Sequence, residues 1–139
     1  MFENPTKPAI DAFLRRIGSI AILGLSDTPG RPSHNVAKAL QKFGYRIVPV
    51  NPTATEILSV RAWPDLPSAL EGAGPIDVVD VFRRPEHVAG IVDECIRLKV
   101  PALWLQEGVI DEAAAQKARD AGIFTVMNRC MLRDRSTLD

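Results

Sequence analysis

Short apolar runs alternate with segments of helical periodicity along this chain, and this alternation restricts the fold more than any other feature of the sequence. The runs are nearly continuous and do not alternate with polar residues, which is typical of strands buried on both faces of a parallel sheet. The expected strands are 20–24, 45–50, 77–82, 102–105 and 123–127. A further short strand is expected near Ile57 and Leu58.

Helical segments occupy the intervals between these runs. Residues 4–17 form a leading segment with apolar positions at helical spacing, and residues 33–43 form the first connecting helix, with Ser33 as its N-cap. Later helices are expected after Pro67, from Pro85 to Cys95, and from Asp111 to Ala121. Because strands and helices take turns, we predict an α/β fold: a Rossmann-like, doubly wound, mostly parallel sheet of about five to six strands in three α/β/α layers.

Chain length and charge restrict the class of protein. A length of 139 residues fits one domain, so we expect a single domain over 1–139, with a leading helix at 1–17 and a polar tail at 133–139. Lys plus Arg and Asp plus Glu both number 17, so no overall field would attract nucleic acid or an anionic membrane surface. No stretch approaches the ~18 apolar residues of a membrane span, and the N-terminus lacks the apolar core of a signal peptide.

The two cysteines, Cys95 and Cys130, lie far apart and have neither CxxC nor Cys/His spacing. This argues against a disulfide scaffold and against a zinc site, so we expect no metal and a cytoplasmic location. Cys95 falls on the apolar face of its helix and is expected in the core. Cys130 follows Arg129, whose charge would stabilise a thiolate.

The residues that follow each expected strand are polar, basic or glycine, although a plain connector could hold any residue type. In open parallel sheets, ligands bind outside the carboxyl ends of the strands, because helix N-termini there present unpaired N–H groups and partial positive charge. These strand ends are 24–33, 51–53, 82–85, 106–109 and 128–130. We therefore expect the functional site at this edge of the sheet.

The first of these loops lacks the dinucleotide fingerprint G-x-G-x-x-G, because it reads Gly-Leu-Ser-Asp-Thr-Pro from Gly24. Asn51 also stands where that fold carries an acidic residue for the ribose hydroxyls, so an NAD site is disfavoured twice. The hydroxyl of Ser26, the guanidinium of Arg31 and a helix start at Ser33 suit a pyrophosphate. A turn and N-cap without any ligand is the alternative.

Arg83 and Arg84 directly follow the apolar Phe82 at the end of the third main strand. Guanidinium groups match phosphate oxygens and also stack on flat rings. The alternative is a pair of solvated surface charges. Their position at the expected ligand edge favours a role in binding.

Four segments stand in a recognisable order and spacing: GLSDTPGRPSHNVAKALQKFGYRIVPVNP, IDVVDVFRRPE, LWLQEGVI and VMNRC. Together they resemble the bacterial stand-alone CoA-binding protein family, which is related to the CoA-binding N-terminal domain of the succinyl-CoA synthetase α-subunit. The resemblance covers 17–130 and implies a Rossmann-like site for coenzyme A or acyl-CoA. It weakens near the C-terminus, where the family usually has an acidic residue in place of Asn128 and a proline followed by a basic residue in place of Met131 and Leu132.

The resemblance also implies roles for the strand-end residues. Those expected at the phosphates of the cofactor are Gly24, Ser26, Arg31 and Ser33. Those expected along the second strand end are Asn51 and Pro52, and those at the adenine or the 3′-phosphate are Phe82, Arg83 and Arg84. The residues that would border the pantetheine arm or form the floor of the site are Trp104, Gln106 and Gly108.

The expected function is therefore the binding of coenzyme A or acyl-CoA, as a sensor, carrier or accessory subunit with no catalysis of its own established. Two alternatives stay open. One is an NAD(P)-dependent oxidoreductase or another nucleotide-binding enzyme that uses the same crevice, and the other is a structural dimerisation module. The expected partner is the small-molecule cofactor, and a homodimer or an enzyme partner subunit stays open.

A few other residues carry reactive groups. His34 and His87 lie near helix starts and are expected to be surface or capping residues rather than general bases. Cys130 is either an inert packed cysteine or a thiol that forms a mixed disulfide with the thiol of the cofactor. Asp80 interrupts an apolar strand, where an unpaired carboxylate is costly, so we expect it to face the solvent edge, pair with a basic side chain, or accept bonds from the first loop.

Overall fold

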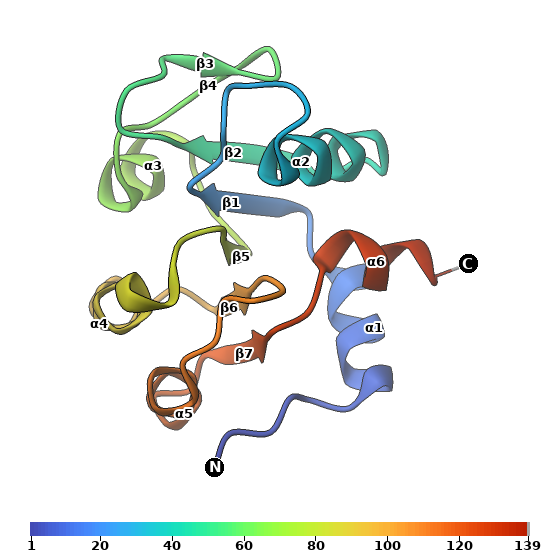
Figure 1. Ribbon diagram of the computed structural model, residues 1–139, viewed down its shortest axis with the longest axis vertical. Coiled ribbons are helices and arrows are strands. Elements are labelled where there is room, and N and C mark those ends of the chain that lie inside the picture. The colour runs from blue at the N-terminus through green and yellow to red at the C-terminus, as the bar shows by residue number, and fades with distance from the viewer. Residues whose placement is uncertain (139) are drawn as a thin grey trace.

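The computed structural model describes residues 1–138, with a five-stranded sheet at its centre (Figure 1). The strands are β1 (Ser19–Leu23), β2 (Arg46–Val50), β5 (Val78–Val81), β6 (Ala102–Leu105) and β7 (Phe124–Met127). They lie in the order β2-β1-β5-β6-β7, and every neighbouring pair is parallel. The direction in which strands are added reverses between β1 and β5, so their carboxyl ends form the topological switch point at which such sheets bind ligands.

Helices cover both faces of the sheet, as Figure 1 shows. On one face lie α1 (Lys7–Arg16), α2 (Pro32–Lys42) and α6 (Met131–Ser136). On the other lie α3 (Leu66–Gly72), α4 (Val88–Arg97), which follows the 3₁₀ turn η1 (Pro85–His87), and α5 (Glu112–Asp120). Every residue of β1, β5 and β6 is buried between these layers, which confirms the predicted Rossmann-like α/β fold. Within residues 1–138, none of the helices combines the length and apolar content that crossing a bilayer requires.

A small antiparallel hairpin connects β2 to α3. Its strands are β3 (Glu56–Ile57) and β4 (Val60–Arg61), which pair as Glu56 with Arg61 and Ile57 with Val60. The short strand expected near Ile57 and Leu58 is therefore the first strand of this hairpin, and Leu58 belongs to its turn, with φ of 54°.

The start of α2 and the C-terminal segment differ from the sequence prediction. Arg31 occupies the N-cap of α2 and Ser33 lies inside its first turn, so the assignment of Ser33 as N-cap is wrong. His34, expected as a surface or capping residue, is buried and so does not lie on the helix surface. The segment predicted as a polar tail from Arg133 onward is helical as far as Ser136, because α6 packs against the first face of the sheet through Met131.

Candidate functional site

Two adjoining cavities open at the switch point of the sheet. One, of about 380 Å³, extends from the β1 end toward the loop after β6, and the other, of about 450 Å³, extends toward the end of β2. Five residues line both cavities: Gly24, Ser26, Phe82, Arg83 and Arg84. The two cavities therefore form one continuous hollow, which we call the switch-point crevice.

Apart from Trp104, the structure brings every residue expected to contact the cofactor to this crevice. Besides the five shared residues, the β6 side contains Arg31, Ser33, Gln106 and Gly108, and the β2 side contains Asn51 and Pro52. Other residues to which the sequence analysis gave no role in binding also line it: Leu25, Pro32, His87, Glu107 and Val109. His87 is exposed on η1, and the signal for it was its position in the loop that begins with Arg83 and Arg84.

Gly24 allows the end of β1 to lie directly against the end of β5. Its φ is +80°, a conformation that side chains disfavour. A Cβ at this position would collide with the carbonyl oxygen of Phe82 and would lie 2.8 Å from Cδ of Arg83. Glycine therefore sets the close approach of the two strand ends on which the crevice is built.

Two side chains hold the first loop in shape. The backbone N–H of Ser26 donates to Oγ of Ser33 at 2.9 Å, and Nδ2 of Asn51 donates to the Leu25 carbonyl oxygen at 2.9 Å. Oδ1 of Asn51 accepts from the backbone N–H of Thr53 at 2.9 Å and from its hydroxyl at 3.1 Å. Asn51 therefore uses its amide group to join two strand ends.

The N-terminus of α2 lies at the crevice without a capping side chain. Arg31 makes no capping hydrogen bond, Pro32 has no N–H, and the first turn contains no acidic residue. The backbone N–H groups of Ser33 and His34 are among those that a helix leaves without an internal partner. With the positive end of the helix dipole, these groups form a site that favours an anion.

Three arginines line the crevice around this helix end. Within residues 1–138, Arg31 and Arg83 form no ion pair, and Arg84 lies 3.8 Å from Glu86 with both side chains mostly exposed. An exposed pair of this kind contributes little, about 0–1 kcal/mol. The guanidinium groups are therefore available to a multiply charged anion.

The loop after β6 forms one wall of the crevice and is fixed from behind. Oε1 of the buried Gln106 accepts from the backbone N–H of Met131 at 3.1 Å. The N–H of Gly108 donates to Oδ1 of Asn128 at 2.9 Å, and Asn128 itself has a φ of 59°. Residues at the end of β7 and the start of α6 thus position this wall.

Trp104 is the one residue of the expected floor that does not reach the crevice. It is fully buried, and its Nε1 donates to the carbonyl oxygen of Arg129 at 2.8 Å. It therefore supports the segment after β7 from within the core. Cys130, in the same segment, is half-buried, and its mixed disulfide with a cofactor thiol stays a prediction.

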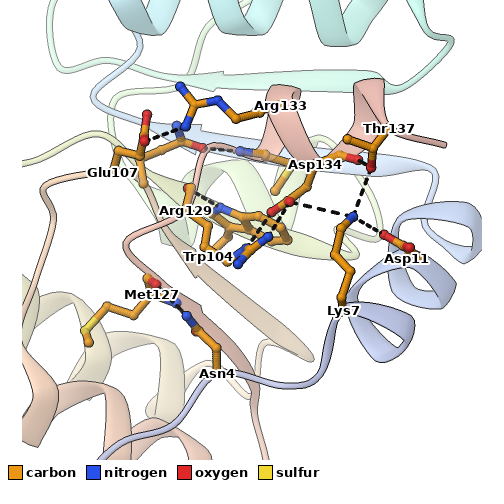
Figure 2. A network of polar contacts seen from close by, with 12 residues as sticks. Asn4, Lys7, Asp11, Trp104, Glu107, Met127, Arg129, Arg133, Asp134 and Thr137 are labelled. Atoms are coloured by element: carbon orange, nitrogen blue, oxygen red, sulfur yellow. Dashed lines mark hydrogen bonds and ion pairs between the residues drawn. The ribbon is translucent and has the colours of Figure 1, made fainter.

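A network of ion pairs joins this segment to the two terminal helices, as Figure 2 shows. Arg129 donates two hydrogen bonds to Asp134, at 2.8 and 2.6 Å, and Nζ of Lys7 lies 3.8 Å from the same carboxylate. Asp134 is buried, and its hydrogen bonds raise the pKa of Arg129. Arg133 pairs separately with Glu107 at 2.6 Å.

Asp80 satisfies none of the three expectations for it. It lies in the central strand β5 between Ile22 and Trp104, is fully buried, and neither carboxyl oxygen meets a donor in hydrogen-bond geometry. Burial raises the pKa of Asp80 well above its usual value, and the nearby Val81 N–H opposes this shift to a smaller extent. The carboxyl group of Asp80 therefore keeps its proton to a higher pH than an exposed aspartate does.

Comparisons with known proteins agree with this architecture. A family model described as a CoA binding domain matches residues 18–135. YneT of Bacillus subtilis, described as uncharacterized, is 43% identical over 129 residues, which are 93% of this chain and 93% of YneT. A solved hypothetical protein from Pyrococcus horikoshii OT3 has a TM-score of 0.87 and 33% identity, with 99% of each chain covered.

Part of the chain is also similar in sequence to an enzyme. Acetate–CoA ligase (ADP-forming) II of Archaeoglobus fulgidus is 32% identical over 79 residues. The match covers 55% of this chain but 11% of the ligase.

Proposed function

The chain belongs to the CoA-binding domain family, and from this premise we propose that it binds coenzyme A or acyl-CoA in the switch-point crevice. The observation that carries the proposal is the uncapped N-terminus of α2, with Arg31, Arg83 and Arg84 around it. Coenzyme A has a diphosphate and a separate 3′-phosphate, so it can satisfy both the helix end and the guanidinium groups. Helix N–H groups and arginine forks are the usual protein partners of such oxygens.

Each part of the crevice suits one part of the cofactor. The diphosphate would bind at the start of α2 and Arg31, where the Ser26–Ser33 bond fixes the loop. The adenine and the 3′-phosphate would bind at Phe82, Arg83 and Arg84, beside the end of β2 with Asn51 and Pro52. The pantetheine arm would then follow the wall formed by Gln106 and Gly108.

The same geometry disfavours the dinucleotide alternative. Nδ2 and Oδ1 of Asn51, which stands where a ribose-binding acid is expected, are already hydrogen-bonded to the backbone of Leu25 and Thr53. The ribose hydroxyls of NAD would find no free acceptor on this side chain. The proposal is for binding and assigns no catalytic role to His34, which is buried, or to His87, which is exposed.

Calorimetric titration tests the proposal with coenzyme A, dephospho-coenzyme A, NAD, NADPH and ATP. We expect coenzyme A to bind most tightly. Dephospho-coenzyme A should bind about tenfold more weakly or worse, because one charge-assisted contact contributes at least about 1.5 kcal/mol. NADPH binding with no response to coenzyme A would support the oxidoreductase alternative, and no binding of coenzyme A at millimolar concentration would defeat the proposal.

Variants connect binding to the crevice. R83Q and R84Q should each weaken the binding of coenzyme A by about tenfold. R97Q is the matched control, since Arg97 lies in the last turn of α4 and lines neither cavity. If R97Q weakened binding as much as R83Q did, the cofactor would bind elsewhere.

A further inference from the structure

A smaller polar cavity adjoins the switch-point crevice on its β7 side. Its volume is about 160 Å³, and we call it the α6 pocket. Its lining residues are Glu107, Asn128, Arg129, Cys130, Arg133 and Asp134. Because Glu107 lines both hollows, the α6 pocket lies next to the wall of Gln106 and Gly108, within reach of a ligand that follows this wall.

One charged pair in the α6 pocket is fixed. Arg129 holds Asp134 through two hydrogen bonds of 2.6 and 2.8 Å, and the Asp134 side chain is only 6% exposed (Figure 2). Lys7 adds a second positive charge 3.8 Å away. The carboxylate of Asp134 is therefore committed to protein cations and is not available to a ligand.

The other charged pair can exchange partners. Arg133 and Glu107 are joined at 2.6 Å, but their side chains are 69% and 51% exposed. Such a surface pair contributes little to stability, and a released Glu107 would be solvated at once. Arg133 can therefore turn from Glu107 to a ligand carboxylate at small cost.

We propose that the α6 pocket receives the acyl group of an acyl-CoA and selects acyl groups that end in a carboxylate. The inference rests on the proposed binding of coenzyme A in the crevice. Arg133 supplies the exchangeable cation, and the side-chain amide of Asn128 supplies a further donor. At about 30 Å³ for each water-sized group, the volume suits a chain of about five such groups, so the class is a short dicarboxylic acyl-CoA.

Paired ligands of equal chain length test this selectivity. Succinyl-CoA and butyryl-CoA both carry four-carbon acyl groups, and only the first ends in a carboxylate. By calorimetry we expect succinyl-CoA to bind about tenfold more tightly to the unmodified protein, the ratio that one charge-assisted contact supports. R133Q should bring this ratio close to one.

Two further variants separate the contact from general charge effects. The double variant E107Q/R133Q keeps the net charge and should also lose the preference. R135Q changes the charge of the same helix by the same amount. The Arg135 side chain, however, stacks on the Phe43 ring, 4.4 Å from its centroid, and does not line the α6 pocket. In R135Q the ratio of succinyl-CoA to butyryl-CoA affinity should therefore equal that of the unmodified protein. Thermal melts of each variant establish that it is folded.

The outcomes distinguish this inference from the function on which it rests. If coenzyme A binds and succinyl-CoA and butyryl-CoA bind equally, the α6 pocket does not select carboxylates and the inference is overturned. If the preference persists in R133Q, the carboxylate is read elsewhere and the inference is again overturned. If coenzyme A itself fails to bind, the proposed function fails first.

Discussion

At the scale of single residues, the burial of Asp80 disfavours the charged form of its carboxyl group. Its folded-state pKa lies well above the unfolded value, so the folded protein keeps a proton that the unfolded chain releases as pH rises past about 4. The contribution of Asp80 to the free energy of unfolding is therefore fully present below the unfolded pKa, and it is lost as pH rises toward the folded pKa. Each pH unit in that window lowers the free energy of unfolding by about 1.4 kcal/mol.

We predict that D80N removes this dependence, because asparagine resembles the protonated acid in shape and does not ionise. In urea unfolding, D80N and the unmodified protein should be similar at pH 4. The variant should become more stable by up to about 1.4 kcal/mol for each unit above that, until the folded pKa is reached. E71Q, at an exposed acid of α3, is the control. A difference between D80N and the unmodified protein that does not grow with pH would contradict the assignment.

At the scale of elements, α6 depends on contacts with residues outside the helix itself. Asp134 joins it to Arg129 and to Lys7 of α1, and the N–H of Met131 at its start is bonded to Gln106. We predict that D134N lowers the free energy of unfolding by about 1–3 kcal/mol, because it weakens hydrogen bonds to a charged partner. Hydrogen exchange should then show faster exchange at Met131 and at Gly108.

The comparison variant for this element is D120N, which changes an exposed acid of α5 and should cost less than about 0.5 kcal/mol. Equal losses in D134N and D120N would mean that the network does not hold α6. Chemical denaturation measures both variants directly.

The same helix explains what the sequence could and could not predict about the fold. The strands were predicted because their apolar runs report burial on both faces, and α5 was predicted with its cap at Asp111, whose carboxylate accepts from Ala114 N–H. In α6 the sequence MLRDRS is mostly polar, and the residues that stabilise it lie outside the helix: Arg129 just before it, Gln106 after β6, and Lys7 near the N-terminus. The spacing of apolar residues within a segment does not predict contacts of this kind.

The candidate site shows the same division. Topology alone predicted that the strand ends would meet, because the carboxyl ends of parallel strands share one edge. The hydrogen-bond partner of each side chain was not predictable. Oγ of Ser33 accepts from the N–H of Ser26 instead of capping its own helix, and Nδ2 of Asn51 donates to the Leu25 carbonyl oxygen. These assignments depend on loop geometry that residue type does not determine.

At the scale of the whole molecule, the charges balance while the crevice is positive. Lys plus Arg and Asp plus Glu number 17 each, so no long-range field attracts an anionic cofactor. In the proposed complex, attraction would come from Arg31, Arg83 and Arg84 acting over roughly a Debye length, about 10 Å at 0.1 M salt. Added salt should therefore weaken binding through these local contacts.

We predict that raising salt from about 0.05 to about 0.5 M weakens coenzyme A binding by about three- to tenfold. Dephospho-coenzyme A should show a shallower dependence, because it has one phosphate fewer to be screened. In R83Q the dependence on salt should also become shallower, while R97Q should keep the slope of the unmodified protein. Calorimetry at several salt concentrations measures these slopes, and a dissociation constant that does not change with salt would mean that the arginines of the crevice do not contact the phosphates.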